Sequence, residues 1–399
     1  MALPRVRIQF LNGALGQVEA SEDGVVGVLT TGVAVSTTFL LLTSYKLTKF
    51  DDLTTLGITQ ANNPGIWKLM TELYNQNPNG AEVWLKAFAD TVTLTNMATR
   101  TYTSGVQELL QTANGRIRTL IIHRTPAGGY SATITAGLDA DVTTAIAAAQ
   151  ITAAWATDTL KAPIFVAIAG IYYSGVDSAL TAINIGTNNR VCVMVGDTVS
   201  GNGCAIGLLA GKLAAVPVQR NIGRVKDGAV LGVTLAYYAA TKLESNDVTG
   251  VHDKGYITLR THVGRSGYFF VDGPLAALPA DDYSQITARR TVDKAFRIAY
   301  TTLVNEMLDE VSVTDKGKIS VAYAKSIENK VENAIINSMT ANGELGNDPG
   351  DQNDTGVSCW INTDQNIVAT GQVNVTLKVK PYGYARYIEV SLGFKTLTA

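Results

Sequence analysis

Short, wholly apolar runs separated by helical patterns dominate the first half of this chain. The clearest run is "APIFVAIAG" at residues 162–170. A strand without polar alternation is buried on both faces, so helices must cover both sides of a sheet that is at least partly parallel. Similar strand candidates lie at 82–89, 118–123 and 190–195, and helical patterns lie at 64–74, 104–112, 139–155, 175–183 and 204–215. The sequence therefore predicts an α/β unit here.

The second half of the chain has a different order of predicted elements. Two long helices follow residue 281, then a loop rich in Gly, Asp and Asn, then strands only. The apolar residues recur at helical spacing in both helices. They are Ile286, Val292, Phe296, Ala299, Leu303 and Met307 in the first, and Ile319, Tyr323, Ile327, Val331, Ile335 and Met339 in the second. The fold class predicted for the whole chain is mixed α/β.

Both ends of the chain alternate apolar and polar residues, which is typical of half-buried strands. Near the start the apolar residues are Val6, Ile8 and Phe10. Near the end a first run covers residues 373–379, and a second contains Ile388, Val390, Leu392 and Phe394. Terminal strands of this kind can pair within the chain or extend to the open sheet edge of a neighbour. The pattern alone allows both.

The composition excludes some classes of function. With 32 Lys plus Arg against 34 Asp plus Glu, the formal charge of −2 offers no general attraction to nucleic acid or to an anionic membrane. Only 17% of residues are charged, against about 25% in typical domains, as expected of a large core or of surface hidden against other copies. The three scattered cysteines, Cys192, Cys204 and Cys359, fit buried thiols of a cytoplasmic product. No signal peptide or membrane-spanning run is recognised.

No catalytic, cofactor-binding or metal-binding residues are predicted. The glycine-rich stretch at 196–214 has Ile206 where a dinucleotide or phosphate loop needs glycine, and Leu213 follows Lys212 where magnesium binding needs a hydroxyl. These glycines instead favour a strand-to-helix turn and close helix packing. The three histidines do not have zinc-ligand spacing. An α/β enzyme with an unrecognised active site stays open as an alternative.

The first long helix carries a charged side opposite its apolar stripe. Arg289, Arg290, Asp293 and Arg297 lie on it, and Arg289–Asp293 and Asp293–Arg297 are i, i+4 pairs. Such a side is either a solvated face or a basic patch suited to acidic groups on another protein.

Taken in order, several motifs along the chain resemble the contractile tail sheath proteins of bacteriophages and related injection systems. They are "GVVGVLTTGVA" followed by "LLLTSYKLTKFDDLTTLGI", then "SQITARRTVDKAF", "IENKVENAIINSMTANGELG", and the alternating strands from Trp360 to Phe394. Residues 89–137 match little of this pattern, and "GRVKDGAVLGVTLAYY" replaces a stretch of the family that contains tryptophan.

The resemblance implies a structural subunit that polymerises around an inner tail tube and contracts to drive the tube through a cell envelope. Expected partners are copies of the chain stacked in rings, the tube protein, and baseplate and terminator proteins. The expected location is a virion tail or phage-like particle assembled in the bacterial cytoplasm, without cofactors. Another self-assembling tube or shell protein is a further alternative.

The resemblance also implies a layout for the chain. We expect an N-terminal arm at 1–23, an α/β domain at 24–270 with a possible insert near 89–137, a C-terminal core domain at 271–385 and a C-terminal arm at 386–399. The arms would add strands to the sheets of neighbours, and the α/β domain would lie further out. The predicted contact residues are Val6, Ile8, Phe10, Ile388, Val390, Leu392 and Phe394 in the arms, and Arg289, Arg290, Asp293 and Arg297 facing the tube.

Overall fold

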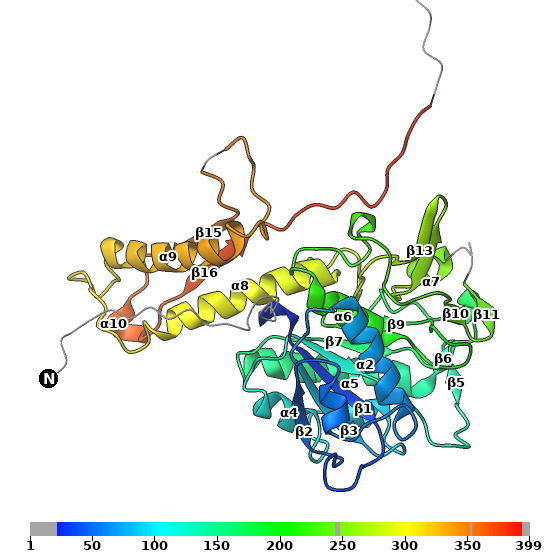
Figure 1. Cartoon of the computed structure of the whole chain (residues 1–399). Coiled ribbons are helices and arrows are strands. Elements are labelled where there is room, and N and C mark those ends of the chain that lie inside the picture. The colour runs from blue at the N-terminus through cyan, green and yellow to red at the C-terminus, as the bar shows by residue number, and fades with distance from the viewer. Residues whose placement is uncertain (1–21, 244–247, 352, 393–399) are drawn as a thin grey trace, which may run out of the picture. The chain divides into compact units, whose positions relative to one another are not determined.

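A computed structural model describes residues 22–243, 248–351 and 353–392 of the chain (Figure 1). Its contacts divide the chain into two units, unit 1 at Met1–Arg297 and unit 2 at Ile298–Ala399. The division falls within a long helix, α8 (Ile286–Val304). The boundary that the sequence suggests near residue 270 stays a prediction. The predicted N-terminal strand at 5–10 lies outside the described residues.

A six-stranded sheet forms the centre of unit 1. Its order is β2-β3-β1-β4-β7-β9, in which β2 is antiparallel to β3 and the other neighbours are parallel. The strands are β1 (Val26–Thr31), β2 (Ser44–Leu47), β3 (Val83–Phe88), β4 (Thr119–Ile122), β7 (Phe165–Ala169) and β9 (Val191–Met194). All residues of β1, β4, β7 and β9 are buried, so the predicted, partly parallel sheet is confirmed. Because β4 lies between β1 and β7, the suggested insert at 89–137 includes a central strand of the sheet.

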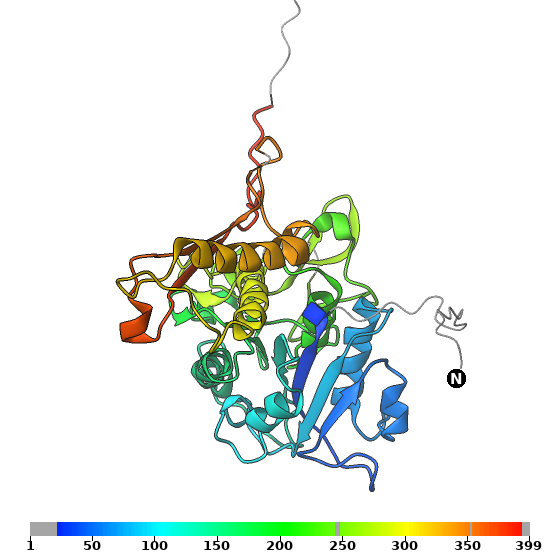
Figure 2. The same cartoon turned by 90° about the vertical axis from the view of Figure 1, so that its left-hand side faces the viewer.

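Helices cover both faces of this sheet, as continuous apolar strands require (Figure 2). The helix α2 packs with α6, and α3 packs with α5. The helices of unit 1 that precede α8 are α1 (Asp52–Thr55), α2 (Pro64–Gln76), α3 (Leu94–Ala98), α4 (Val106–Thr112), α5 (Ala140–Asp158), α6 (Ile206–Ala215) and α7 (Thr249–His252).

Two glycines allow the close approach of α6 to α2. A Cβ atom at Gly207 would lie 2.3 Å from the carbonyl oxygen of Leu69, and one at Gly211 would lie 2.2 Å from that of Leu73. Any side chain at either position would therefore push the helices apart. The packing role predicted for the glycine-rich stretch is confirmed.

Short strands and single turns complete unit 1. They are β5 (Ile134–Thr135), β6 (Leu138–Asp139), β8 (Thr187–Asn188), β10 (Tyr237–Tyr238), β11 (Thr241–Lys242), β12 (Leu259–His262), β13 (Arg265–Phe270), β14 (Ala276–Ala277), η1 (Glu22–Gly24), η2 (Asp177–Ala179) and η3 (Val225–Asp227). The helix predicted at 175–183 is wrong, because only η2 forms there. Lys254 Nζ, from a distant segment, donates to the carbonyl oxygens of Asp177 (2.7 Å) and Leu180 (2.6 Å) and holds this stretch as a loop.

Unit 2 consists of the end of α8 and a helix packed on a two-stranded sheet. Its elements are α9 (Val321–Ile335), a π-helical turn (Ile336–Thr340), β15 (Val357–Ile361), α10 (Ile367–Thr370) and β16 (Val375–Val379). The stripe of Ile327, Val331, Ile335 and Met339 is buried, and α9 packs against β15. The predicted second helix, and the first of the two C-terminal alternating runs, are confirmed.

The three cysteines are buried free thiols, as predicted. Among the described residues, no helix is both long enough and apolar enough to cross a membrane.

Candidate assembly surface

The sheet of unit 2 has two edges with different surroundings. β15 pairs with β16 in antiparallel register, with Cys359 opposite Leu377 and Ile361 opposite Val375. In such a pair, residues that face each other direct their N–H groups either both inward or both outward. The N–H groups of Cys359 and Ile361 point away from β16. Those of Val375 and Leu377 therefore point outward from the other edge.

Two glutamates of α9 close the edge of β15. Glu332 Oε1 accepts the N–H of Cys359 at 2.7 Å, and Glu328 Oε1 accepts that of Ile361 at 2.8 Å. The spacing of four residues along α9 matches the spacing of two along the strand. Lys325 forms an ion pair with Glu328 and neutralises its buried charge. With its donors occupied, β15 is a poor site for an added strand.

We expect the double change Glu328→Ala and Glu332→Ala to destabilise the subunit and open this edge. Each buried N–H that loses its acceptor costs about 1–3 kcal/mol, and the exposed edge becomes a second site for strand addition. The measurement is chemical unfolding together with light scattering of the unassembled subunit. The double change Asn329→Ala and Asn333→Ala, at two exposed positions four apart on the same helix, is the matched control. If the double variant unfolds like the parent, the glutamates do not protect the edge.

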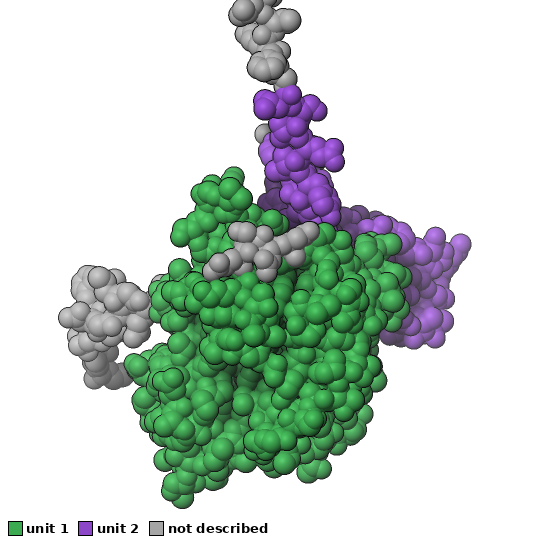
Figure 3. Space-filling model, turned by 90° about the vertical axis from the view of Figure 1, so that its right-hand side faces the viewer, with its two compact units in different colours: residues 1–297 green, residues 298–399 purple. Residues whose placement is uncertain are grey.

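The edge of β16 is open. In the described part of the chain no strand other than β15 pairs with β16. After β16 the chain continues without regular secondary structure as far as residue 392 (Figure 1). The space-filling view shows a narrow projection of unit 2 (Figure 3). The strand predicted over the second C-terminal run does not form within the described residues. The predicted contact residues Val6, Ile8, Phe10 and Phe394 lie outside them.

The apolar residues of this C-terminal segment face solvent. The exposed fractions are 80% for Ile388, 78% for Val390 and 96% for Leu392, and Tyr387 is exposed as well. Burying such side chains is favourable by roughly 1.5–3 kcal/mol each. Unit 2 therefore combines an open strand edge with an alternating apolar segment that no other described residue of the chain covers.

The charged side of α8 is not an exposed patch, which corrects the sequence-based expectation. Arg289, Arg290 and Asp293 are only 7%, 4% and 4% exposed. Asp293 receives both terminal nitrogens of Arg190, at 3.0 and 3.2 Å, and pairs with Arg289 at 3.1 Å. The first of the two predicted i, i+4 pairs is therefore confirmed. These side chains bind other groups of unit 1 and do not form an exposed basic surface among the described residues.

The other two arginines of this side have partners within unit 1 as well. Arg290 donates to the carbonyl oxygens of Leu213 (2.9 Å) and Val216 (3.1 Å) and so caps the C-terminal end of α6. Arg297 and Lys294 each pair with Asp23 at 2.5 Å. Burial alone would raise the pKa of Asp23. Lys294, Arg297 and Arg290 outweigh it and hold that pKa below its ordinary value.

Charged side chains also gather near the carboxyl ends of the sheet strands, where α/β enzymes bind ligands. Lys68 lies 2.6 Å from both Glu72 and Asp197, and Thr198 Oγ1 donates to Glu72. Burial lowers the pKa of the nearby His123 to about 3, so this ring is neutral at pH 7. Lys68 pairs with both acids, and Glu72 Oε2 is buried without a hydrogen-bond partner among the described residues. The described residues contain no group of three His, Cys, Asp or Glu side chains suited to a metal ion.

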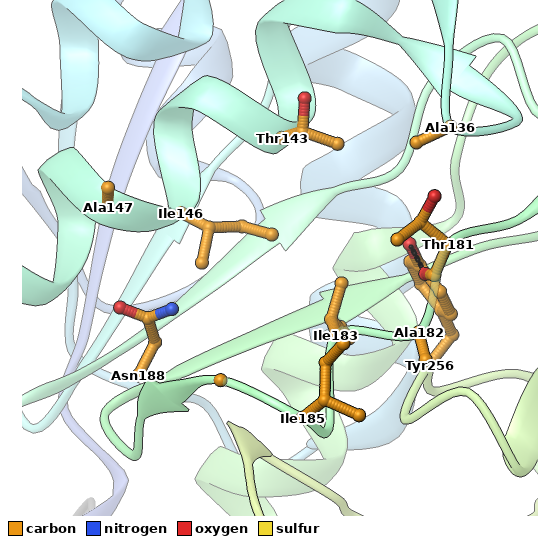
Figure 4. A pocket seen from close by; sticks show the side chains of 11 residues that line it. Ala136, Thr143, Ile146, Ala147, Thr181, Ala182, Ile183, Ile185, Asn188 and Tyr256 are labelled. Atoms are coloured by element: carbon orange, nitrogen blue, oxygen red, sulfur yellow. Dashed lines mark hydrogen bonds between the residues drawn. The ribbon is translucent and has the colours of Figure 1, made fainter.

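A pocket of about 330 Å³ lies between α5 and the loop at 181–188 (Figure 4). Thr143, Ile146 and Ala147 line it from the helix, and Ile183 and Ile185 line it from the loop. Its lining residues include no acid, no histidine and no basic side chain. This chemistry does not supply a general acid and base pair.

The fold as a whole matches contractile sheath structures. A chain of "Cryo-EM structure of the anti-feeding prophage (AFP) baseplate, 6-fold symmetrised" aligns with a TM-score of 0.63 at 15% identity, over 99% of this chain and 100% of that one. A chain of the AFP helical sheath in its contracted state gives 0.63 at 16%, over 98% and 99%. A chain of the PVC sheath complex in its contracted state, from an extracellular contractile injection system, gives 0.58 at 14%, over 98% of both chains. The expected fold of the contractile sheath proteins is confirmed.

The sequence also matches two family models. Residues 3–274 match "DUF2586, N-terminal domain" and residues 282–398 match "DUF2586, C-terminal domain". The chain belongs to the DUF2586 family. Comparison with curated protein sequences gives no significant match.

Proposed function

We propose that this chain is the structural subunit of a contractile tail sheath and that it polymerises by strand donation. The main support for this proposal is that unit 2 has both a surface that could accept a strand and a segment that could be donated as one. The sheet has one closed edge and one open edge, and the C-terminal segment has alternating exposed apolar residues. Its likeness in fold to the sheath of the anti-feeding prophage supports the same function.

The donated strand would be residues 386–394 of one subunit, and the acceptor would be β16 of the next. An added strand gains main-chain hydrogen bonds from the outward N–H groups of Val375 and Leu377, and alternate side chains give it register. Donor and acceptor are different surfaces of the same chain. Such head-to-tail contacts generate rings or open helices rather than closed dimers. The residues at 5–10 would form a second arm.

The sheath would store free energy during assembly and release it on contraction. Subunits add around an inner tail tube in an extended, kinetically trapped state, and a trigger from the baseplate lets their interfaces repack into a shorter array. The arms keep subunits connected while the two units move as rigid bodies. This mechanism needs no nucleotide and no cofactor. Tube, baseplate and terminator proteins are the partners, in a virion tail or phage-like particle assembled in the bacterial cytoplasm.

Electron microscopy of the concentrated, purified protein tests this function. We expect long striated tubes or stacked rings. Compact, uniform particles at every concentration, together with turnover in a substrate screen, would support the alternative of an α/β enzyme that uses the cluster at Lys68, Glu72 and Asp197. Closed shells instead of tubes would indicate another kind of self-assembling protein.

A further inference from the structure

A basic hairpin tip projects from unit 1. The strands β12 and β13 form an antiparallel hairpin with an irregular register near its tip (Figure 1). Val263 at the tip is fully exposed, and Arg260 and Arg265 beside it are exposed as well. Burial and the two arginines lower the pKa of His262, so the positive charge at neutral pH comes from the arginines. In the described residues neither guanidinium pairs with a carboxylate.

An exposed acidic turn with an apolar residue at its centre follows α8 in unit 2, and its charge is opposite to that of the hairpin tip. Leu308 is fully exposed, and its backbone has a φ of +63°. That conformation is unfavourable for a residue with a branched side chain and is tolerated mainly where function requires it. Met307 beside it is exposed, and the exposed acids Asp309 and Glu310 follow directly. The turn therefore exposes a strained leucine next to two acids, and such a surface is suited to a partner that is both apolar and basic.

We propose that the hairpin tip of one subunit binds the acidic turn of a second copy. Arg260 and Arg265 would pair with Asp309 and Glu310, and Val263 would pack on Leu308. The two surfaces lie on different units, so the contact is heterologous and repeats through a lattice. This inference rests on the proposed function and adds to it an electrostatic contact that is separate from the arms. Because it consists of a few charges around a small apolar centre, it is suited to breaking and re-forming when the lattice changes shape.

Charge reversal and mixing test this contact. The variant Arg260→Glu/Arg265→Glu has two acidic surfaces, and the variant Asp309→Lys/Glu310→Lys has two basic ones. Alone, each should polymerise poorly, with a critical concentration raised about tenfold or more, because like charges then face each other. Mixed in equal amounts, the two variants should polymerise near the parental concentration, because every contact between unlike variants again joins opposite charges.

The mixture distinguishes the contact from its alternatives. If tip and turn met within one chain, each variant would carry the mismatch internally and mixing would not restore assembly. If each variant alone polymerised like the parent, the contact would not exist. Either result would overturn the inference and leave the sheath function intact. A parent that forms no tubes at all would contradict the sheath function, and this contact with it.

A third variant tests the apolar centre. Leu308→Gly removes the exposed side chain and relieves the positive φ, so the unassembled subunit should melt at or slightly above the parental temperature. Assembly should weaken all the same. Unchanged assembly of this variant would show that Leu308 makes no contact.

Discussion

Removal of residues 386–399 should leave a folded, soluble subunit that no longer polymerises. The described apolar residues of this segment are 78–96% exposed, so their loss takes almost nothing from the core of the subunit. Thermal unfolding, measured under conditions that prevent assembly, should therefore stay close to that of the parent. Every contact of the lattice would lose its donated strand at once, so electron microscopy should show single subunits instead of tubes.

Two point substitutions make the same test more selective. Ile388→Asp and Val390→Asp keep the backbone of the donated strand but place charges against β16 of the neighbour. Val368→Asp is the matched control, since Val368 is an exposed valine of unit 2 outside the segment, and this variant should assemble normally. An intramolecular strand behaves differently, because it buries several side chains worth roughly 1.5–3 kcal/mol each. Variants that precipitate or melt far below the parent would therefore show that the segment belongs to its own fold.

The change Asp23→Asn should destabilise unit 1 strongly. Asp23 is a largely buried carboxylate that pairs with Lys294 and Arg297, and it lies just before β1 at the end of the predicted N-terminal arm. Its neutralisation removes an ion pair from both Lys294 and Arg297, in a site where burial and Arg297 already lower the pKa of Arg118 to about 10. Breaking a buried pair from one side costs about 3–5 kcal/mol. For a unit of this size the melting temperature should fall by roughly 10 °C.

The pH dependence of this effect has a defined sign. The folded pKa of Asp23 is below the unfolded value of about 3.9. The stability from Asp23 is therefore fully present above that pH and is lost as the pH falls through the folded pKa. Parent and variant should differ most at neutral pH and converge below about pH 4. The neighbouring exposed acid provides the control, as Glu22→Gln should melt like the parent. Equal melting of the Asp23→Asn variant would exclude the ion-pair account.

The local pattern of apolar residues was sufficient to predict the strands and the helix that form the core. The apolar runs at 118–123, 162–169 and 190–195 are β4, β7 and β9, because a strand covered on both faces must be apolar throughout. The four-residue step through Ile327, Val331 and Ile335 is the buried stripe of α9. In each case the spacing of the apolar residues along the sequence shows which side chains are buried.

Elements whose partners are distant in sequence were not predictable in this way. The charged side of α8 resembled a solvated face or a surface patch, but Asp23 and Arg190 bury it from positions more than 100 residues away. The pattern at 175–183 suggested a helix, yet Lys254 and Tyr256 bind its carbonyl oxygens from another segment. Helical periodicity cannot report such long-range partners.

The edge-closing glutamates were also missed. Glu328 and Glu332 stand four apart, beside the apolar stripe of α9 rather than opposite it, and this placement is the signal that sequence reasoning could have used. A buried acid next to a stripe needs donors, and the N–H groups of β15 supply them. The acceptor edge of β16 followed only from the register of the two strands.

Strand donation is tested most directly by a cryo-electron microscopy structure of the polymer in which the backbone of unit 2 can be traced. We expect an additional strand on the outer edge of β16, built from residues 386–392 of a neighbouring subunit, with Ile388 and Val390 buried. If residues 386–392 were instead folded back on β16 of their own subunit, or if that edge carried no strand at all, strand donation would be wrong.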